Sequence, residues 1–205
     1  MTSSKHARLA ILLVVIAAIA ASLGSELLLS SFSTVAAPID VLRGEHRGLR
    51  SEHGGAFGDG AVPDGTTVFD DGIPGVANLD PALLVALRQA ASDAADEGVE
   101  FFVDSGWRSP EYQERLFAEA VSEYGSEAEA ARWVATPNTS AHVSGDAVDI
   151  GHSEATAWLS EHGAEFGLCQ IYGNEPWHFE LRAEAGDYGC PAMYADPTHD
   201  PRMQR

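Results

Sequence analysis

The positions of one histidine and one aspartate constrain the fold of this chain more than any other feature. His142 and Asp149 lie seven residues apart. On one α-helix they would be about 10.5 Å apart along the axis, and on one unbroken strand the odd offset would place them on opposite faces. To bring both side chains to one point, the chain must bend at Ser144 and Gly145, since glycine accepts the positive φ of a bulge or tight turn. We expect a strand with His142, a break at Gly145 and a second strand over residues 147–150.

A second segment adds a histidine and a carboxylate. Polar and apolar residues alternate over residues 178–181, which predicts a strand whose polar face carries His178. Pro176 lacks an N–H and suits the start of such a strand. Glu175, immediately before Pro176, can lie over a metal ion without binding it. Together the two segments hold the residue types of a catalytic zinc site, which combines three protein ligands, one open position and a nearby base.

A third segment, Ser-Gly-Trp-Arg-Ser at residues 105–109, is followed by Gln113. With S-x-H-x-x-G-x-A-x-D at 140–149 and E-x-W-H at 175–178, it completes a set of three ordered motifs. This set resembles the VanY-type D-alanyl-D-alanine carboxypeptidases and their dipeptidase relatives, zinc enzymes that trim peptidoglycan stem peptides. Three motifs in this order are a far more specific signal than any one of them alone.

The resemblance implies a role for each motif residue. His142, Asp149 and His178 would bind one zinc ion, Glu175 would be the general base, and Arg108 would stabilise the scissile carbonyl. The implied reaction removes the C-terminal D-alanine of a stem peptide. One alternative is a D,D-dipeptidase or L,D-carboxypeptidase with the same chemistry. Another is a non-catalytic, zinc-stabilised module that binds the cell wall or a partner, although a structural zinc site needs neither the glutamate nor the arginine.

Two further polar residues are candidates for substrate binding. Ser140 lies next to the metal segment, where it would either hydrogen-bond the substrate or cap a turn. Gln113 follows the Arg108 loop by one helical turn and is expected to face the same cleft. His152 lies three residues after Asp149, but we expect it to open the next helix rather than to bind zinc.

The N-terminal residues have the composition of an export signal. Residues 1–8 are basic and residues 9–24 form an apolar run without charge. The run is shorter than the roughly 20 residues that span a bilayer, although Leu27–Leu29 could extend it. Residues 1–37 are therefore predicted to be either a cleaved signal peptide or an N-terminal membrane anchor. Either places the rest of the protein outside the cytoplasm, secreted or anchored to the membrane facing the wall.

The remaining chain divides into a linker and one domain. Residues 38–74 are rich in glycine and read as a flexible linker with entry loops, and residues 75–205 as a zinc D,D-carboxypeptidase domain. The expected order is helix, strand, helices, strand, helix, strand, which indicates the α+β class. The resemblance implies a small, mostly antiparallel sheet that carries the zinc site, with helices packed on one side, as in the hedgehog-like fold of the DD-peptidases.

Local signals mark the expected helices. Asp80 can cap a helix that begins at a proline, and Ser109 can cap the next one. An amphipathic helix is expected at about residues 126–134. Another is expected over residues 153–162, with Gly163 closing it in the left-handed conformation.

The cysteines and the net charge narrow the class of protein further. Cys169 and Cys190 are the only two cysteines, and in an exported chain they are expected to form a disulfide. Cys169 precedes and Cys190 follows the strand with His178, so the bond would join the two flanks of that strand. The chain has 12 Lys and Arg against 31 Asp and Glu, a formal charge of −19. Such a chain lacks the basic face that nucleic acid requires. We expect a monomer whose partner is the stem peptide.

Overall fold

The computed structural model describes residues 58–204. The predicted signal peptide or anchor and residues 38–57 of the predicted linker lie outside this range. Four strands form one antiparallel sheet in the order β1-β2-β4-β3: β1 Phe102–Ser105, β2 Ala147–Gly151, β3 Leu168–Gln170 and β4 His178–Leu181. The predicted α+β class with a small antiparallel sheet is confirmed.

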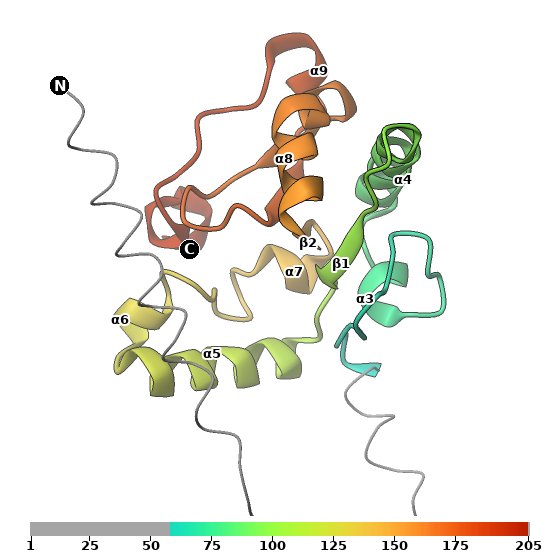
Figure 1. Cartoon of the computed structure of the whole chain (residues 1–205). Coiled ribbons are helices and arrows are strands. Elements are labelled where there is room, and N and C mark those ends of the chain that lie inside the picture. Colours follow the sequence, from blue (N-terminus) through green and yellow to red (C-terminus); the bar gives the residue numbers. More distant parts are fainter. Residues whose placement is uncertain (1–57, 205) are drawn as a thin grey trace, which may run out of the picture. The chain divides into compact units, whose positions relative to one another are not determined.

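Helices of one to four turns connect and cover the strands (Figure 1). The α-helices are α3 Pro74–Ala77, α4 Pro81–Asp96, α5 Pro110–Tyr124, α6 Glu127–Ala130, α7 Ala141–Ser144, α8 Ser153–His162 and α9 Ala185–Tyr188. The 3-10 helices are η1 Gly163–Phe166, η2 Pro197–His199 and η3 Pro201–Gln204. Among the described helices, none is both long and apolar enough to cross a membrane.

The predicted starts of the two longest helices are confirmed. The Asp80 carboxylate accepts hydrogen bonds from the backbone N–H groups of Ala82 at 2.8 Å and Leu83 at 3.2 Å, and α4 begins at Pro81. Ser109 Oγ accepts from the backbone N–H of Tyr112 at 3.1 Å. These side chains satisfy N–H groups that have no partner inside their own helix.

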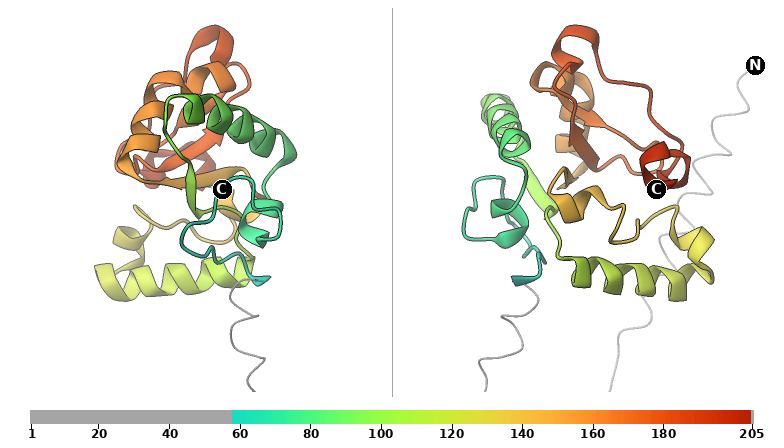
Figure 2. Two further views of the ribbon diagram at one scale, coloured as in Figure 1. Left: turned by 45° about the vertical axis from the view of Figure 1, so that its right-hand side comes forward. Right: turned by 180° about the vertical axis from the view of Figure 1, so that it is seen from behind.

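The apolar face of the sheet packs against α4 and α8. Val148 and Phe179 from the central strands are fully buried there, against Leu83 and Leu87 of α4 and Leu159 of α8. Figures 1 and 2 show α5 apart from α4 and α8, with α7 between them. The opposite, polar face of the sheet is therefore left for the functional site.

Two local predictions are wrong. Gly163 has φ −57° and continues the chain into η1, and Gly167 instead takes the left-handed conformation at φ 77°. A Cβ on Gly163 would lie 2.6 Å from the Leu168 carbonyl oxygen, so glycine is needed for close approach. The helix expected at residues 126–134 ends after one turn at Ala130, and the chain continues in turns past Trp133, whose side chain is exposed.

The segment after α9 runs back across the molecule, and we call residues 191–204 the C-terminal strap (Figures 1 and 2). Its backbone bonds to the loop after β3, with the Tyr194 N–H donating to the Ile171 carbonyl at 2.9 Å. Further along, the Asp196 carboxylate accepts from Arg132 at 3.2 Å. The strap is thus bonded both to the loop after β3 and to the turn after α6.

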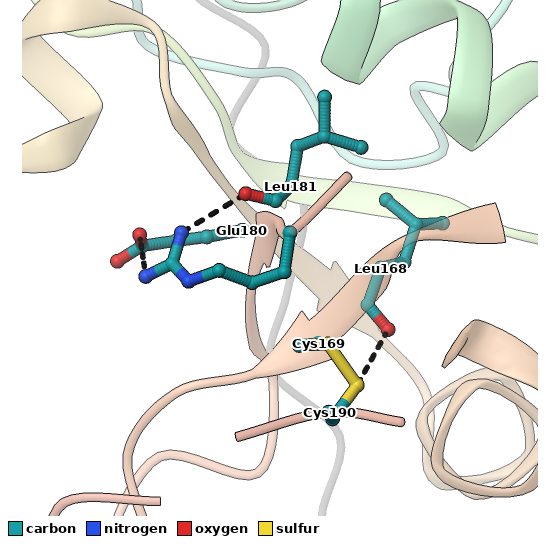
Figure 3. The surroundings of a disulfide bond; sticks show 6 residues. Leu168, Cys169, Glu180, Leu181 and Cys190 are labelled. Atoms are coloured by element: carbon teal, nitrogen blue, oxygen red, sulfur yellow. Dashed lines mark hydrogen bonds and ion pairs between the residues drawn. A yellow bond between two sulfur atoms is a disulfide. The ribbon is translucent and has the colours of Figure 1, made fainter. Parts of the chain in front are cut away.

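A disulfide fixes the chain just before the strap, as predicted. Cys169 in β3 is bonded to Cys190, 21 residues later. Figure 3 shows this bond beside Glu180 of β4, the residue that pairs with Cys169 in the sheet. The disulfide therefore links the edge strand β3 to the residue that precedes the strap.

We expect loss of the disulfide to lower the free energy of unfolding by about 3 kcal/mol, because the bond restricts the unfolded chain over a loop of this size. Denaturant unfolding of the oxidised and reduced protein measures the difference. Thiol labelling of unreduced protein should find no free cysteine, and two labelled thiols per chain would contradict the prediction.

The contribution of Asp196 in the strap to the free energy of unfolding should fall in acid. Burial raises the pKa of Asp196, but hydrogen bonds from Thr198, His199 and Arg132 outweigh it and lower the pKa to about 2. A lowered carboxyl pKa stabilises the fold above its unfolded value of about 4, and the stabilisation is lost as the pH falls through the folded value. The difference in unfolding free energy between wild type and Asp196→Asn should therefore shrink from about pH 4 to about pH 2. A difference that stays constant over this range would contradict the prediction.

Candidate metal centre

Sheet register brings two of the predicted ligands together. Asp149 of β2 is paired directly with His178 of β4. Directly opposite residues in an antiparallel pair project from the same face with their Cβ atoms about 5 Å apart. Neighbours Val148 and Phe179 point to the other face, into the core. The same alternation that builds the apolar core therefore aims the two polar side chains at the site.

The third predicted ligand, His142, lies on a helical turn. The prediction of a strand around His142 is therefore wrong. His142 lies in α7, which ends at Gly145 with φ 82°. The left-handed glycine turns the chain from α7 into β2, so the expected bend is present although the element before it differs. A Cβ on Gly145 would lie 2.6 Å from the Asn78 carbonyl oxygen, so close packing also requires glycine here. A helix rises only about 1.5 Å per residue, roughly half the rise of a strand, so the helical turn keeps His142 closer to Asp149 than a strand would.

Three potential ligand atoms converge at the polar face of the sheet. His142 Nε2 lies 3.3 Å from His178 Nδ1, and Asp149 Oδ1 lies 3.4 Å and 3.1 Å from these two nitrogens. Zinc bonds of 2.0–2.1 Å in a tetrahedron separate neighbouring ligand atoms by about 3.3 Å. The triangle therefore matches one face of a zinc coordination tetrahedron and leaves its fourth corner open.

His152 is not part of this group. It stands at the N-cap of α8 with a positive φ of 67°, and its ring packs against Phe102 with 4.8 Å between centroids. The expectation that it opens the helix is confirmed.

Each candidate ligand is held from behind by a second group. His142 Nδ1 contacts the Gly106 carbonyl oxygen at 2.8 Å, and His178 Nε2 contacts Glu180 Oε1 at 3.4 Å. Asp149 Oδ2 accepts a hydrogen bond from Arg108 at 2.9 Å. Such partners fix the ring orientation and the tautomer of metal-binding histidines. The three motifs do not predict a role for Glu180. Its position two residues after His178, on the same face of one strand, indicates that it can support the histidine.

Charges around the triangle favour an ionised aspartate. Burial raises the pKa of Asp149, but His142, His178 and Arg108 together hold the pKa well below its usual value. Burial and the nearby Arg108 lower the pKa of His142. Burial also lowers the pKa of His178, but the hydrogen bonds with Asp149 and Glu180 outweigh it and raise the pKa to about 9. A metal ion at this site would therefore displace a proton from His178.

Glu175 lies beside the triangle without belonging to it. Its Oε2 is 3.8 Å from His178 Nδ1, whereas its buried Oε1 has no hydrogen-bond partner among the described residues. Burial raises the pKa of Glu175 to about 7, against the opposing effect of His178. A carboxyl group of this pKa next to an open coordination position can take up and release a proton near neutral pH.

Arg108 links two of the motifs. Its guanidinium donates to Ser105 Oγ at 2.7 Å, Gln113 Oε1 at 3.1 Å and Asp149 Oδ2 at 2.9 Å. Gln113 is buried and donates its own amide N–H to the Ala135 carbonyl at 2.8 Å. Gln113 therefore positions Arg108, and a direct contact of Gln113 with substrate stays a prediction.

A cleft of about 330 Å³ opens from the triangle along α5. Arg108, Glu175 and Ser140 line it near the triangle. Its outer wall is aromatic, with Tyr124 and Trp133 stacked at 6.1 Å between centroids. Residues of the strap also contribute to the lining. All the residues predicted to act on substrate therefore share one cavity.

Comparison with known proteins identifies a family for this chain. A family model described as VanY, D-alanyl-D-alanine carboxypeptidase, matches residues 77–184. A D-alanyl-D-alanine carboxypeptidase of Enterococcus faecalis (strain ATCC 700802 / V583) is 38% identical, with 45% of this chain and 44% of the relative covered. The chain thus spans less than half the length of that relative.

Solved structures include two similar chains of related description. The LdcB LD-carboxypeptidase has a TM-score of 0.51 at 24% identity, covering 64% of this chain and 70% of that one. A mutant of the vancomycin resistance D,D-pentapeptidase VanY from a VanB-type cassette, in complex with Zn(II), has a TM-score of 0.48 at 32% identity, covering 51% and 73%. The first likeness shows the fold alone.

We expect the zinc-loaded protein to lose its metal when His142, Asp149 or His178 is replaced by alanine, because each supplies one corner of the triangle. His152→Ala is the matched control and should retain the metal, since its ring lies outside the group. Metal content of the four purified variants, measured by elemental analysis, checks this. Full retention of zinc by Asp149→Ala would overturn the ligand set.

Proposed function

Because the chain belongs to the VanY family of D-alanyl-D-alanine carboxypeptidases, we propose that it is a zinc peptidase that removes the C-terminal D-alanine of peptidoglycan stem peptides. The observation that carries this proposal is the open triangle of ligand atoms with the unpartnered Glu175 oxygen beside it. A metal site with three protein ligands and a nearby base is the arrangement of hydrolytic zinc centres rather than of structural ones.

One zinc ion would be held by His142 Nε2, His178 Nδ1 and Asp149 Oδ1. The bound ion supplies Lewis acidity, which lowers the pKa of water and polarises a carbonyl group. The donor set suits zinc because it combines two imidazole nitrogens with one carboxylate oxygen, and each donor has an outer partner that orients it.

Glu175 would move the proton during hydrolysis. Its carboxylate would take a proton from the attacking water and deliver it to the nitrogen of the leaving D-alanine, so that the peptide bond breaks as the new carboxylate forms. The raised pKa of Glu175, about 7, suits a group that must accept and then donate near neutral pH.

Arg108 would stabilise the oxyanion that develops at the scissile carbonyl. A guanidinium has five N–H donors. Three of the donors on Arg108 are engaged by Ser105, Gln113 and Asp149, and no described residue accepts from the other two. The arginine is thus held in place and still has donors for a substrate oxygen. Ser140 lines the same cleft and is the further substrate contact that we propose.

We further propose that the protein works outside the cytoplasm as a monomer, secreted or held at the membrane by its N-terminal residues. The disulfide between Cys169 and Cys190 suits an oxidising compartment. The substrate lies in the cell wall, outside the membrane.

The substrate is best decided by incubating the zinc-loaded protein with a pentapeptide stem, a tetrapeptide stem and free D-Ala-D-Ala. We expect the pentapeptide to lose its last D-alanine and the dipeptide to be cut poorly, because the cleft continues from the triangle to the aromatic wall and can hold a longer chain. Mass spectrometry identifies the products. Preferred cleavage of the dipeptide or tetrapeptide would indicate a D,D-dipeptidase or L,D-carboxypeptidase, and no cleavage would indicate a binding module.

Glu175→Gln should retain zinc and fold while the rate of D-alanine release falls roughly 10²–10⁴-fold, the usual contribution of a positioned acid–base group. Glu123→Gln, which changes a carboxylate in the same cleft that is not part of the triangle, is the matched control and should keep most activity. Steady-state rates and metal content of both variants decide the role. Turnover at the wild-type rate by Glu175→Gln would eliminate it as the base.

A further inference from the structure

A charged network lies behind His178, on the side away from the cleft opening. Glu180 is 1% exposed and its carboxylate touches His178 Nε2 at 3.4 Å. Arg202 of the strap donates two hydrogen bonds to the same carboxylate, from Nη1 to Oε2 at 2.7 Å and from Nη2 to Oε1 at 3.1 Å. Arg182 adds a third bond at 2.8 Å. A buried carboxylate with this many donors is fixed in one position.

The strap end of the network is buried as well. Asp200 is 0% exposed and accepts from Arg202 Nε at 2.9 Å and from the Tyr172 hydroxyl at 3.1 Å. Arg202 therefore stands between two buried carboxylates, one on the strap and one on β4. Its planar guanidinium bonds both at once with a rigid fork of five donors, whereas a lysine ammonium has three donors and no such fork.

The position of Glu180 matters for the metal centre. His178 offers Nδ1 to the triangle, so its ring proton must lie on Nε2, and the Glu180 carboxylate is the acceptor placed there. If Glu180 were free to rotate, the ring would lose the partner that sets both its angle and its tautomer.

We propose that Arg202 is a positioning residue for the metal centre: by clamping Glu180, it holds the His178 ring with Nδ1 directed at the metal. The inference rests on the proposed zinc site. Arg202 lies in the strap, beyond residues 77–184 that match the family model, whereas Glu180 lies within them. The strap thus adds a part of the site that lies outside the matched residues.

The test is zinc affinity of the full chain, measured by competition with a chromophoric chelator at a temperature where circular dichroism shows each variant folded. Arg202→Met should weaken zinc binding by up to roughly 10–100-fold, the usual cost of losing the outer partner of a metal-binding histidine, because Glu180 is then no longer held in place. Arg202→Lys should recover part of the loss because it retains the charge but not the planar fork. In the cobalt-loaded protein, Arg202→Met should also change the visible absorption spectrum, which reports ligand geometry.

Arg132→Met is the matched control. Arg132 also holds the strap, through Asp196, but it does not touch Glu180. If the strap acted only as a structural support, both variants would lower the melting temperature and the zinc affinity together. We expect Arg132→Met to lower stability while zinc affinity and the cobalt spectrum stay as in wild type.

Wild-type zinc affinity in Arg202→Met, or an equal loss in Arg132→Met, would overturn the inference. If Arg202→Met does not fold, Glu180→Gln decides, because it preserves the shape but removes the charge. We expect weaker zinc binding there too, and unchanged affinity would overturn the inference. If the inference fails but the wild type binds zinc and cuts the stem peptide, the proposed function stands; a wild type that binds no zinc removes both.

Discussion

The pairing of β2 with β4 is the constraint on which the rest of the site depends. Asp149 stands opposite His178, and Val148 stands opposite Phe179, so one register serves the core and the metal centre together. A slip of one residue would turn the carboxylate into the apolar face and bury it among helices. The fully buried Val148 and Phe179 therefore stabilise the arrangement of the polar pair, although they never touch a ligand atom.

The parts that the sequence could predict are those with a local physical signature. The sequence predicts Asp80 and Ser109 as caps because each precedes a helix with a proline at its first position. The sequence predicts the bend at Gly145 because no regular element brings His142 and Asp149, seven residues apart, to one point. The site residues came from three short motifs, and the structure brings the residues of all three into one cleft.

The parts that the sequence does not predict have no local signature. The turn α7 was predicted as a strand because four residues are too few for a helical period to show. The sequence predicts a left-handed cap at Gly163, since nothing in it shows that the Leu168 carbonyl crowds this residue. The clamp of Arg202 on Glu180 joins residues 22 positions apart, and no spacing rule connects them.

The distribution of hydrogen bonds among the buried polar groups separates the support of the site from its reactive part. Glu180 and Asp200 are buried carboxylates with several donors each, as burial of charge requires. Glu175 is also buried, yet one of its oxygens has no partner among the described residues. Leaving a buried acceptor unpaired costs about 1–3 kcal/mol, which a fold tolerates where the group must remain free to bind something else. Glu175 lines the cleft, whereas the fully bonded Glu180 and Asp200 do not, so the unpaired acceptor belongs to the side on which we propose that the proton moves.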